Sequence, residues 1–189
     1  SVTGKIKSIK NNIAKEKEKL EKIGKDNRNQ WQDSKLESLK LQYALIDVVG
    51  DEIGRKLAKD PVMVFIYGSS LGSIKNKILN GLIGDSIQEI LNSPDKMTKE
   101  LTRADGNQSL GIILDAIGIN PYLSGDIIKL KLSNDIKLYD IVNSEGVDNL
   151  VVNKSRDISI EEARKILVDS KIMKNLFITS FETYGKAFE

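Results

Sequence analysis

Apolar side chains recur at intervals of three and four residues in several long stretches of this chain, and this spacing is its strongest constraint on the fold. Residues at such intervals lie on one face of an α-helix, so each stretch is typical of a helix that buries a single face. The stretches cover residues 5–25, 34–54, 71–92 and 159–188. They predict a protein that is mainly α-helical.

A smaller β contribution is expected in the second half of the chain. Residues 127–132 and 136–142 are rich in Ile, Leu, Val and Tyr, and a polar Ser-Asn-Asp turn separates them, which predicts a β-hairpin. We expect a loop at 143–157. The fold class is therefore mainly α with a small β-hairpin, at the margin of α+β. Because we find no internal repeat and no low-complexity linker, we expect residues 1–189 to form a single domain.

Shorter sequence signals predict where helices end and which residues they bury. Two glycines within residues 50–54 predict a break after the second helix. Gly24 and Pro94 predict the ends of the first and third helices, and a Ser159–Glu162 capping box predicts the start of the last one. Trp31 lies near the start of the second helix, where we expect it to anchor the core.

The composition excludes several kinds of site. The 189 residues include no cysteine and no histidine. Disulfides, thiolate metal sites and every histidine-dependent catalytic arrangement are therefore excluded. The net charge of +2 is small, so any affinity for a polyanion must come from local clusters of charge.

The first predicted helix is locally basic, with eight lysines and three glutamates between residues 5 and 25. Residues 1–30 could therefore form a protruding basic helix. One interpretation is an amphipathic helix that packs its apolar face against the rest of the protein and exposes its charged face to solvent. The alternative is contact with the backbone of a nucleic acid.

The most organised group of chemically useful residues is a stripe from Arg55 to Gly68. Arg55, Lys59, Met63 and Tyr67 recur at intervals of four, and Gly68 follows. On a helix this spacing places the side chains on one face. Two cations suit a polyphosphate, and a flat aromatic hydroxyl suits a sugar or the edge of a base. A plainer alternative is a core helix that buries its apolar residues and leaves the two cations on the surface.

The pattern Arg-x-x-x-Lys-x-x-x-Met-x-x-x-Tyr-Gly resembles the fingers-helix motif of single-subunit RNA polymerases of the phage and mitochondrial type. The Lys-x-Pro-Val-Met form is similar to that of polymerases carried by some phages. Related DNA polymerases usually carry Phe at the position of Met63, so this methionine favours RNA synthesis. The resemblance covers about 16 of the 189 residues. Its matching positions are Ile53, Arg55, Lys59, Val62, Met63, Tyr67 and Gly68.

The resemblance implies a role for each residue of the stripe. Arg55 and Lys59 would hold the triphosphate of the incoming nucleotide, and Lys59 would also supply a proton to the leaving pyrophosphate. Tyr67 would sense the ribose 2′-hydroxyl beside the template base. Met63 would shape the nucleotide pocket, and Gly68 would allow the template to approach the backbone. Lys59 and Tyr67 are the candidate catalytic residues.

The resemblance also implies groups that this chain does not supply. The family uses two Mg²⁺ ions held by two palm aspartates. Asp47 and Asp51 precede the motif too closely, and the second palm motif is a His-Asp pair, which a chain without histidine cannot contain. We therefore expect the fingers portion of a larger DNA-directed RNA polymerase, inactive by itself, with Mg²⁺ held by a palm region elsewhere.

The expected partners are nucleoside triphosphates, the DNA template, the nascent RNA and the remaining regions or subunits of the polymerase. We expect no membrane association. The expected location is the cytoplasm of an infected bacterium or the phage virion, with an organelle less favoured.

Two other functions compete with this interpretation. In a nucleotidyltransferase of the polymerase-beta type, residues 62–70 would form a strand followed by Gly-Ser. That class needs two paired acidic residues, and Asp85 has no such partner in the sequence. The other candidate is a non-enzymatic helical phage protein that binds nucleic acid or protein through its first helix.

Overall fold

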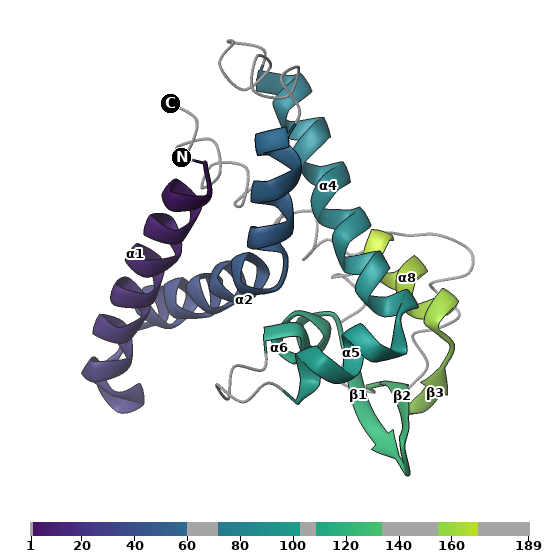
Figure 1. Ribbon diagram of the computed structural model, residues 1–189. Helices are drawn as coiled ribbons and strands as arrows, with labels where there is room; N and C mark the ends of the chain where they lie inside the picture. Colours follow the sequence, from purple (N-terminus) through teal and green to yellow (C-terminus); the bar gives the residue numbers. More distant parts are fainter. Residues whose placement is uncertain (1, 60–71, 103–108, 134–154, 170–189) are drawn as a thin grey trace. The chain divides into compact units, whose positions relative to one another are not determined.

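The computed structural model describes residues 2–59, 72–102, 109–133 and 155–169, which form six α-helices and a three-stranded sheet (Figure 1). This architecture confirms the mainly α fold class. The helices are α1 (Val2–Ile23), α2 (Gln30–Lys59), α4 (Gly72–Asn92), α5 (Pro94–Leu101), α6 (Ser109–Ala116) and α8 (Ile160–Asp169), with a short 3₁₀ turn at Lys25–Asn27. The strands are β1 (Ile119–Ser124), β2 (Ile127–Leu132) and β3 (Arg156–Ile158).

The described residues fall into two compact units that meet within α4. The first contains α1, α2 and α4 as far as Ile83, and the second contains the rest of α4 from Gly84, the sheet, α5, α6 and α8. Each unit buries its own apolar residues. The expectation of a single domain stays a prediction.

The first unit is built on a pair of helices, α1 and α2, that pack against each other. Ile6 and Ile13 of α1 are buried, as the helical spacing predicted. Gly24 ends α1 with φ of +84°, a conformation that other residues rarely adopt. Arg28 then fastens the connection, because its Nη1 donates to the carbonyl of Leu20 at 3.1 Å and its Nε pairs with Asp33 at 2.8 Å.

A buried ion pair joins the two helices. Lys10 Nζ lies 2.5 Å from Asp47 Oδ1, and the Asp47 side chain is only 1% exposed. The ring of Tyr43 lies beneath two ammonium groups, with Lys10 Nζ 5.3 Å and Lys17 Nζ 4.7 Å from its centroid. These contacts fix how α1 lies along α2.

The predicted break at residues 50–54 is wrong, because α2 runs without interruption from Gln30 to Lys59. Each glycine in a helix interior costs about 1 kcal/mol relative to alanine. Val49 and Ile53 beside them are fully buried, and burying one such side chain contributes about 1.5–3 kcal/mol. Packing therefore outweighs the local preference. Figure 1 shows α2 bending between its two halves, which glycines permit readily.

The prediction that Trp31 anchors the core is also wrong. Its side chain is 70% exposed, and Ile23 at the end of α1 is 36% exposed. Both residues lie at the turn of the α1–α2 pair, where a side chain has few neighbours to pack against. A large apolar side chain predicts burial only where another element covers it.

The second unit packs three helices and one end of α4 with the sheet. The antiparallel strand order is β1-β2-β3, with Leu130 of β2 opposite Pro121 on one side and Ile158 on the other. Leu130, Leu132 and Ile158 are buried, whereas Lys129 and Lys131 between them are exposed. The sheet therefore has one apolar face and one polar face, as its alternating sequence requires.

One strand of the predicted hairpin is confirmed. Residues 127–132 form β2, but β2 pairs with the preceding strand β1 through a tight turn in which Gly125 has φ of +63°. Sequence analysis missed β1 because it contains Pro121. Proline lacks the N–H that a strand interior needs, but it is tolerated at a sheet edge. The predicted partner, 136–142, lies outside the described residues. The loop predicted at 143–157 is wrong at its end, where β3 begins at Arg156.

The helix ends of the second unit follow the local signals. Ser93 caps α5, with Pro94 in its first turn. The Ser159 cap is confirmed, because Ser159 Oγ accepts from the backbone N–H of Glu162 at 3.1 Å. Arg164 of α8 donates to Asn92 Oδ1 at 2.7 Å, which ties α8 to the end of α4. The predicted continuation of this helix beyond 169 lies outside the described residues.

Replacing Lys10 by Met should destabilise the first unit by about 1–3 kcal/mol, because the buried Asp47 carboxylate would lose the ammonium group of Lys10, which is itself partly exposed. Chemical unfolding monitored by circular dichroism measures this change. The matched control is Lys22→Met, since the Lys22–Glu18 pair is 3.6 Å long and exposed and should matter by less than about 1 kcal/mol. Equal effects of the two substitutions would contradict the role assigned to the Lys10–Asp47 pair.

Candidate functional site

Arg55 and Lys59 lie together on the last turns of α2. They are four residues apart, so they share one face of the helix and are separated by about 6 Å along its axis. Both are exposed. The structure thus brings these two predicted residues together where an anionic ligand can reach both.

Glu52 partly balances this pair of cations. Arg55 Nη2 donates to Glu52 Oε2 at 2.9 Å, and Lys56 Nζ lies 3.6 Å from Glu52 Oε1. The Arg55 side chain is 67% exposed, and an ion pair so open to water contributes at most about 1 kcal/mol. Lys59 has no ion-pair partner among the described residues. A polyphosphate, which carries more charge than one carboxylate, would compete easily with Glu52 for Arg55.

The remaining residues of the stripe, Met63, Tyr67 and Gly68, lie outside the described residues. Their roles stay predictions. Ile53, which also belongs to the matching pattern and lies two residues before Arg55, is fully buried.

The acidic residues considered for metal binding differ in their surroundings. Asp47 is buried against Lys10, whereas Asp51 on α2 and Asp85 on α4 are exposed. In the part of the chain that the structure describes, no three His, Cys, Asp or Glu side chains lie close enough to hold a metal ion. The described acidic residues thus have structural or surface positions.

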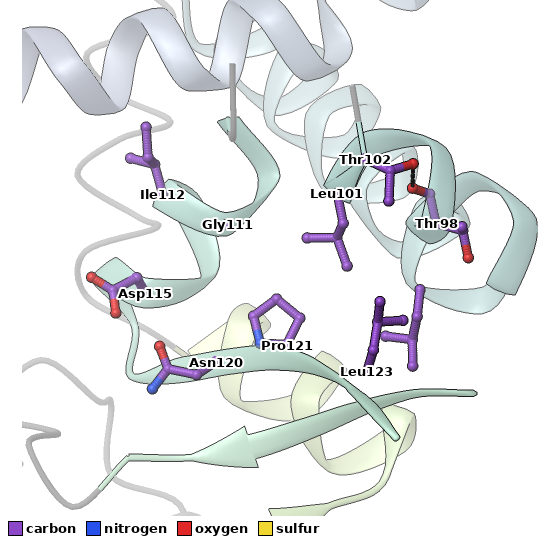
Figure 2. Close-up of a pocket in the computed structure, with 10 residues that line it drawn as sticks. Thr98, Leu101, Thr102, Gly111, Ile112, Asp115, Asn120, Pro121 and Leu123 are labelled. Carbon is purple, nitrogen blue, oxygen red and sulfur yellow. Dashed lines mark hydrogen bonds between the residues drawn. The ribbon is translucent and has the colours of Figure 1, made fainter. Parts of the chain in front are cut away.

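The second unit contains a pocket of about 480 Å³ between α5, α6, β1 and β2 (Figure 2). Figure 2 shows Leu101 and Pro121 pointing into it, with Asp115 and Asn120 together at one end. It is lined by Thr98, Leu101, Thr102, Gly111, Ile112, Asp115, Asn120, Pro121, Leu123 and Ile128.

The lining of this pocket does not suit a triphosphate. It contains no lysine or arginine, and Asp115 would repel an anion. The hydroxyls of Thr98 and Thr102 donate to the carbonyls of Pro94 and Thr98, at 2.8 and 2.6 Å, so they are committed to the backbone of α5. Sequence analysis missed the pocket because its residues come from four separate elements. No local spacing pattern marks it.

The polar face of the sheet carries a small cluster around Tyr122. Its hydroxyl donates to Asp157 Oδ1 at 2.8 Å, and Lys131 Nζ lies 5.2 Å from the ring centroid. The hydrogen bond to Asp157 raises the pKa of Tyr122 above its ordinary value of 10.0, with lesser contributions from desolvation and the Asp157 charge. The cluster links β1 to β3 across the central strand.

Comparison with known protein families identifies the chain. The family described as the bacteriophage N4 RNA polymerase, helical domain, matches residues 3–117, which is more than half of the chain. The chain belongs to this family. The matched range includes α1, α2, α4, α5, α6 and the Arg55–Gly68 stripe, whereas the sheet and α8 lie beyond it. Neither a curated protein nor a solved structure matches the chain.

Membership in this family confirms the broader part of the resemblance, namely a domain of a phage RNA polymerase. An N4-type RNA polymerase domain works in transcription, in the presence of nucleic acid and nucleoside triphosphates. None of the described helices combines the length and the apolar character that crossing a membrane would require.

The Tyr122–Asp157 bond predicts a measurable alkaline titration. Because the folded pKa of Tyr122 is raised, the stabilisation from this bond is complete below the unfolded pKa and is lost as the pH rises through the folded pKa. Replacing Asp157 by Ala should lower the pKa of one phenol, as measured by tyrosinate absorbance. Tyr122→Phe should remove that phenol from the titration. An unchanged curve for the Asp157 variant would contradict this assignment.

Proposed function

We propose that this chain is the fingers portion of a phage-type DNA-directed RNA polymerase and that it grips the incoming nucleoside triphosphate. The observation that supports this proposal most is the joint exposure of Arg55 and Lys59 on one face of α2, inside the range that matches the polymerase family. The pocket of the second unit lacks any cation and is a poor alternative for the triphosphate.

Arg55 and Lys59 bind the phosphates of the nucleotide. During phosphoryl transfer, negative charge builds on the departing pyrophosphate, and two fixed cations stabilise that charge most in the transition state. Lys59 also supplies a proton to the leaving group. Glu52 holds Arg55 while the site is empty, and the incoming triphosphate displaces it.

The other residues of the stripe select the nucleotide. Tyr67 senses the ribose 2′-hydroxyl, Met63 shapes the pocket, and Gly68 lets the template strand approach the backbone. These roles are implied by the resemblance to the polymerase motif. The methionine supports selection of ribonucleotides over deoxyribonucleotides.

The rest of the reaction requires groups outside this chain. Mg²⁺ is held by carboxylates of a palm region and supplies the metal chemistry of nucleotide transfer. The partners are the DNA template, the nascent RNA and the other regions or subunits of the polymerase. The enzyme acts in the cytoplasm of an infected bacterium or is carried in the virion.

Lys59→Ala, introduced into the polymerase that contains this chain, should slow single-nucleotide addition by about 100-fold or more, because charge on the leaving group loses its stabilising cation. Rapid-quench measurement of one addition gives the rate. The matched control is Lys56→Ala, which removes an equally charged side chain three residues away that pairs with Glu52. If both variants add nucleotides at the normal rate, or both slow equally, the role of Lys59 is wrong.

Tyr67→Phe should leave the rate of ribonucleotide addition within a fewfold of normal and raise the use of deoxyribonucleotides, because the group that senses the 2′-hydroxyl is gone. Competition between the two kinds of triphosphate during primer extension measures this selectivity. Tyr43→Phe is the control, since the Tyr43 ring packs with Lys10 and Lys17. Unchanged sugar selectivity in the Tyr67 variant would refute this role.

A further inference from the structure

The outward face of α1 carries a continuous polar stripe that ends in three lysines. The exposed positions spaced by three and four residues are Gly4, Ser8, Asn11, Lys15, Lys19 and Lys22. This spacing places them on one face of the helix, away from the buried Ile6 and Ile13. The buried face packs on α2, so the lysine stripe faces solvent.

One acidic residue of α1 lies on the face of this stripe, and two lie to its sides. Glu18 is three residues from Lys15 and four from Lys22, so it shares their face of the helix. Glu16 and Glu21 are each one residue from a stripe lysine, which is about 100° around the helix. Lys22 pairs with Glu18 at 3.6 Å, and both side chains are well exposed. Lys15 and Lys19 form no ion pair with any described residue. Two ammonium groups without an ion pair among the described residues, and a third in a weak surface pair, therefore lie along about 10 Å of helix, and an anion can compete with Glu18 for Lys22.

Trp31 lies at the same end of the helix pair as Lys22. The connection between α1 and α2 is fixed, because Arg28 donates to the carbonyl of Leu20 in α1 and pairs with Asp33 in α2. Trp31 belongs to the first turn of α2, between Arg28 and Asp33, and is 70% exposed. A flat aromatic surface is thus presented to solvent at the end of the helix pair where the row of lysines finishes.

We propose that the lysine stripe of α1 and Trp31 together form a binding surface for single-stranded nucleic acid. Lysines spaced along a helix neutralise backbone phosphates without regard to sequence. An exposed indole stacks on an unpaired base, which a duplex does not offer. The stripe contains no apolar residue, so it does not suit insertion into a membrane surface. This site is separate from the nucleotide-gripping residues and does not depend on their role.

The full chain carries its own reporter, because Trp31 is its single tryptophan. The experiment titrates the chain with oligomers of about 20 nucleotides, the length of a modest single-strand site, made of thymidine or of uridine, and with a duplex of equal length. We expect both single strands to quench the tryptophan fluorescence and to bind more tightly than the duplex. The DNA and RNA arms show which strand the surface prefers.

Substitutions separate the phosphate contacts from the stacking contact. The triple variant Lys15→Gln, Lys19→Gln, Lys22→Gln should bind about tenfold or more weakly and should reduce the slope of log affinity against log salt by about 2. The control changes three exposed lysines of the second unit, Lys99, Lys129 and Lys165, to Gln. It alters the net charge equally and should keep both affinity and slope close to normal.

The Trp31 variants lack the reporter, so their binding is measured by the fluorescence anisotropy of end-labelled oligomers. Trp31→Ala should weaken single-strand binding about tenfold and leave duplex binding unchanged, whereas Trp31→Phe should restore most of the loss, because a phenyl ring also stacks. The proposal is overturned if the chain binds none of the oligomers or if the fluorescence does not change on binding. It is equally overturned if the duplex binds as tightly as the single strands, or if the control triple variant loses as much affinity as the α1 variant.

Discussion

The packing of α1 against α2, with the Lys10–Asp47 pair inside it, is the interaction on which the first unit depends. A carboxylate that is 1% exposed is costly to bury without a partner, and Lys10 of α1 supplies one, so this pair helps to specify where α1 lies. That placement turns Ile6 and Ile13 inward and consequently turns Lys15, Lys19 and Lys22 outward. The same helix α2 that receives α1 also carries Arg55 and Lys59. Both surfaces proposed to bind anions are therefore positioned by one helix pair.

Much of the helical part of this fold could be predicted because helix signals are local. The spacing of apolar residues along a helix and the capping residues at its ends are both visible within a few residues of sequence. Ser159 at a helix start and Gly24 at a helix end are examples. The errors arose where distant residues decide. Trp31 is exposed because no other described element covers its side chain at the helix turn, and α2 continues past its glycines because Val49 and Ile53 are buried. Pro121 belongs to a strand because β1 occupies a sheet edge, which the local sequence does not reveal.

In the candidate sites too, local sequence spacing predicts some neighbours and not others. Arg55 and Lys59 could be predicted as neighbours because both lie on one helix, and their spacing alone places them together. The Glu52 contact follows the same rule, at three residues from Arg55. The pocket of the second unit could not be predicted, since Thr98, Asp115, Asn120 and Ile128 come from four elements whose proximity depends on the whole unit. Its lining, which has one carboxylate and no cation, makes it a poor site for an anionic ligand.

A net charge of +2 gives little indication of how this chain meets anions, because the cations are grouped. Arg55 is held by a neighbouring carboxylate in a weak surface pair, an arrangement suited to a ligand that must arrive and leave at every turnover. The α1 lysines lie in a row along one helix, with Glu18 in a weak surface pair with Lys22, an arrangement suited to a polymer that slides while remaining bound. A polymerase needs both behaviours at once. The exposure of each cation and its nearest carboxylate distinguish these two arrangements, whereas the total charge does not.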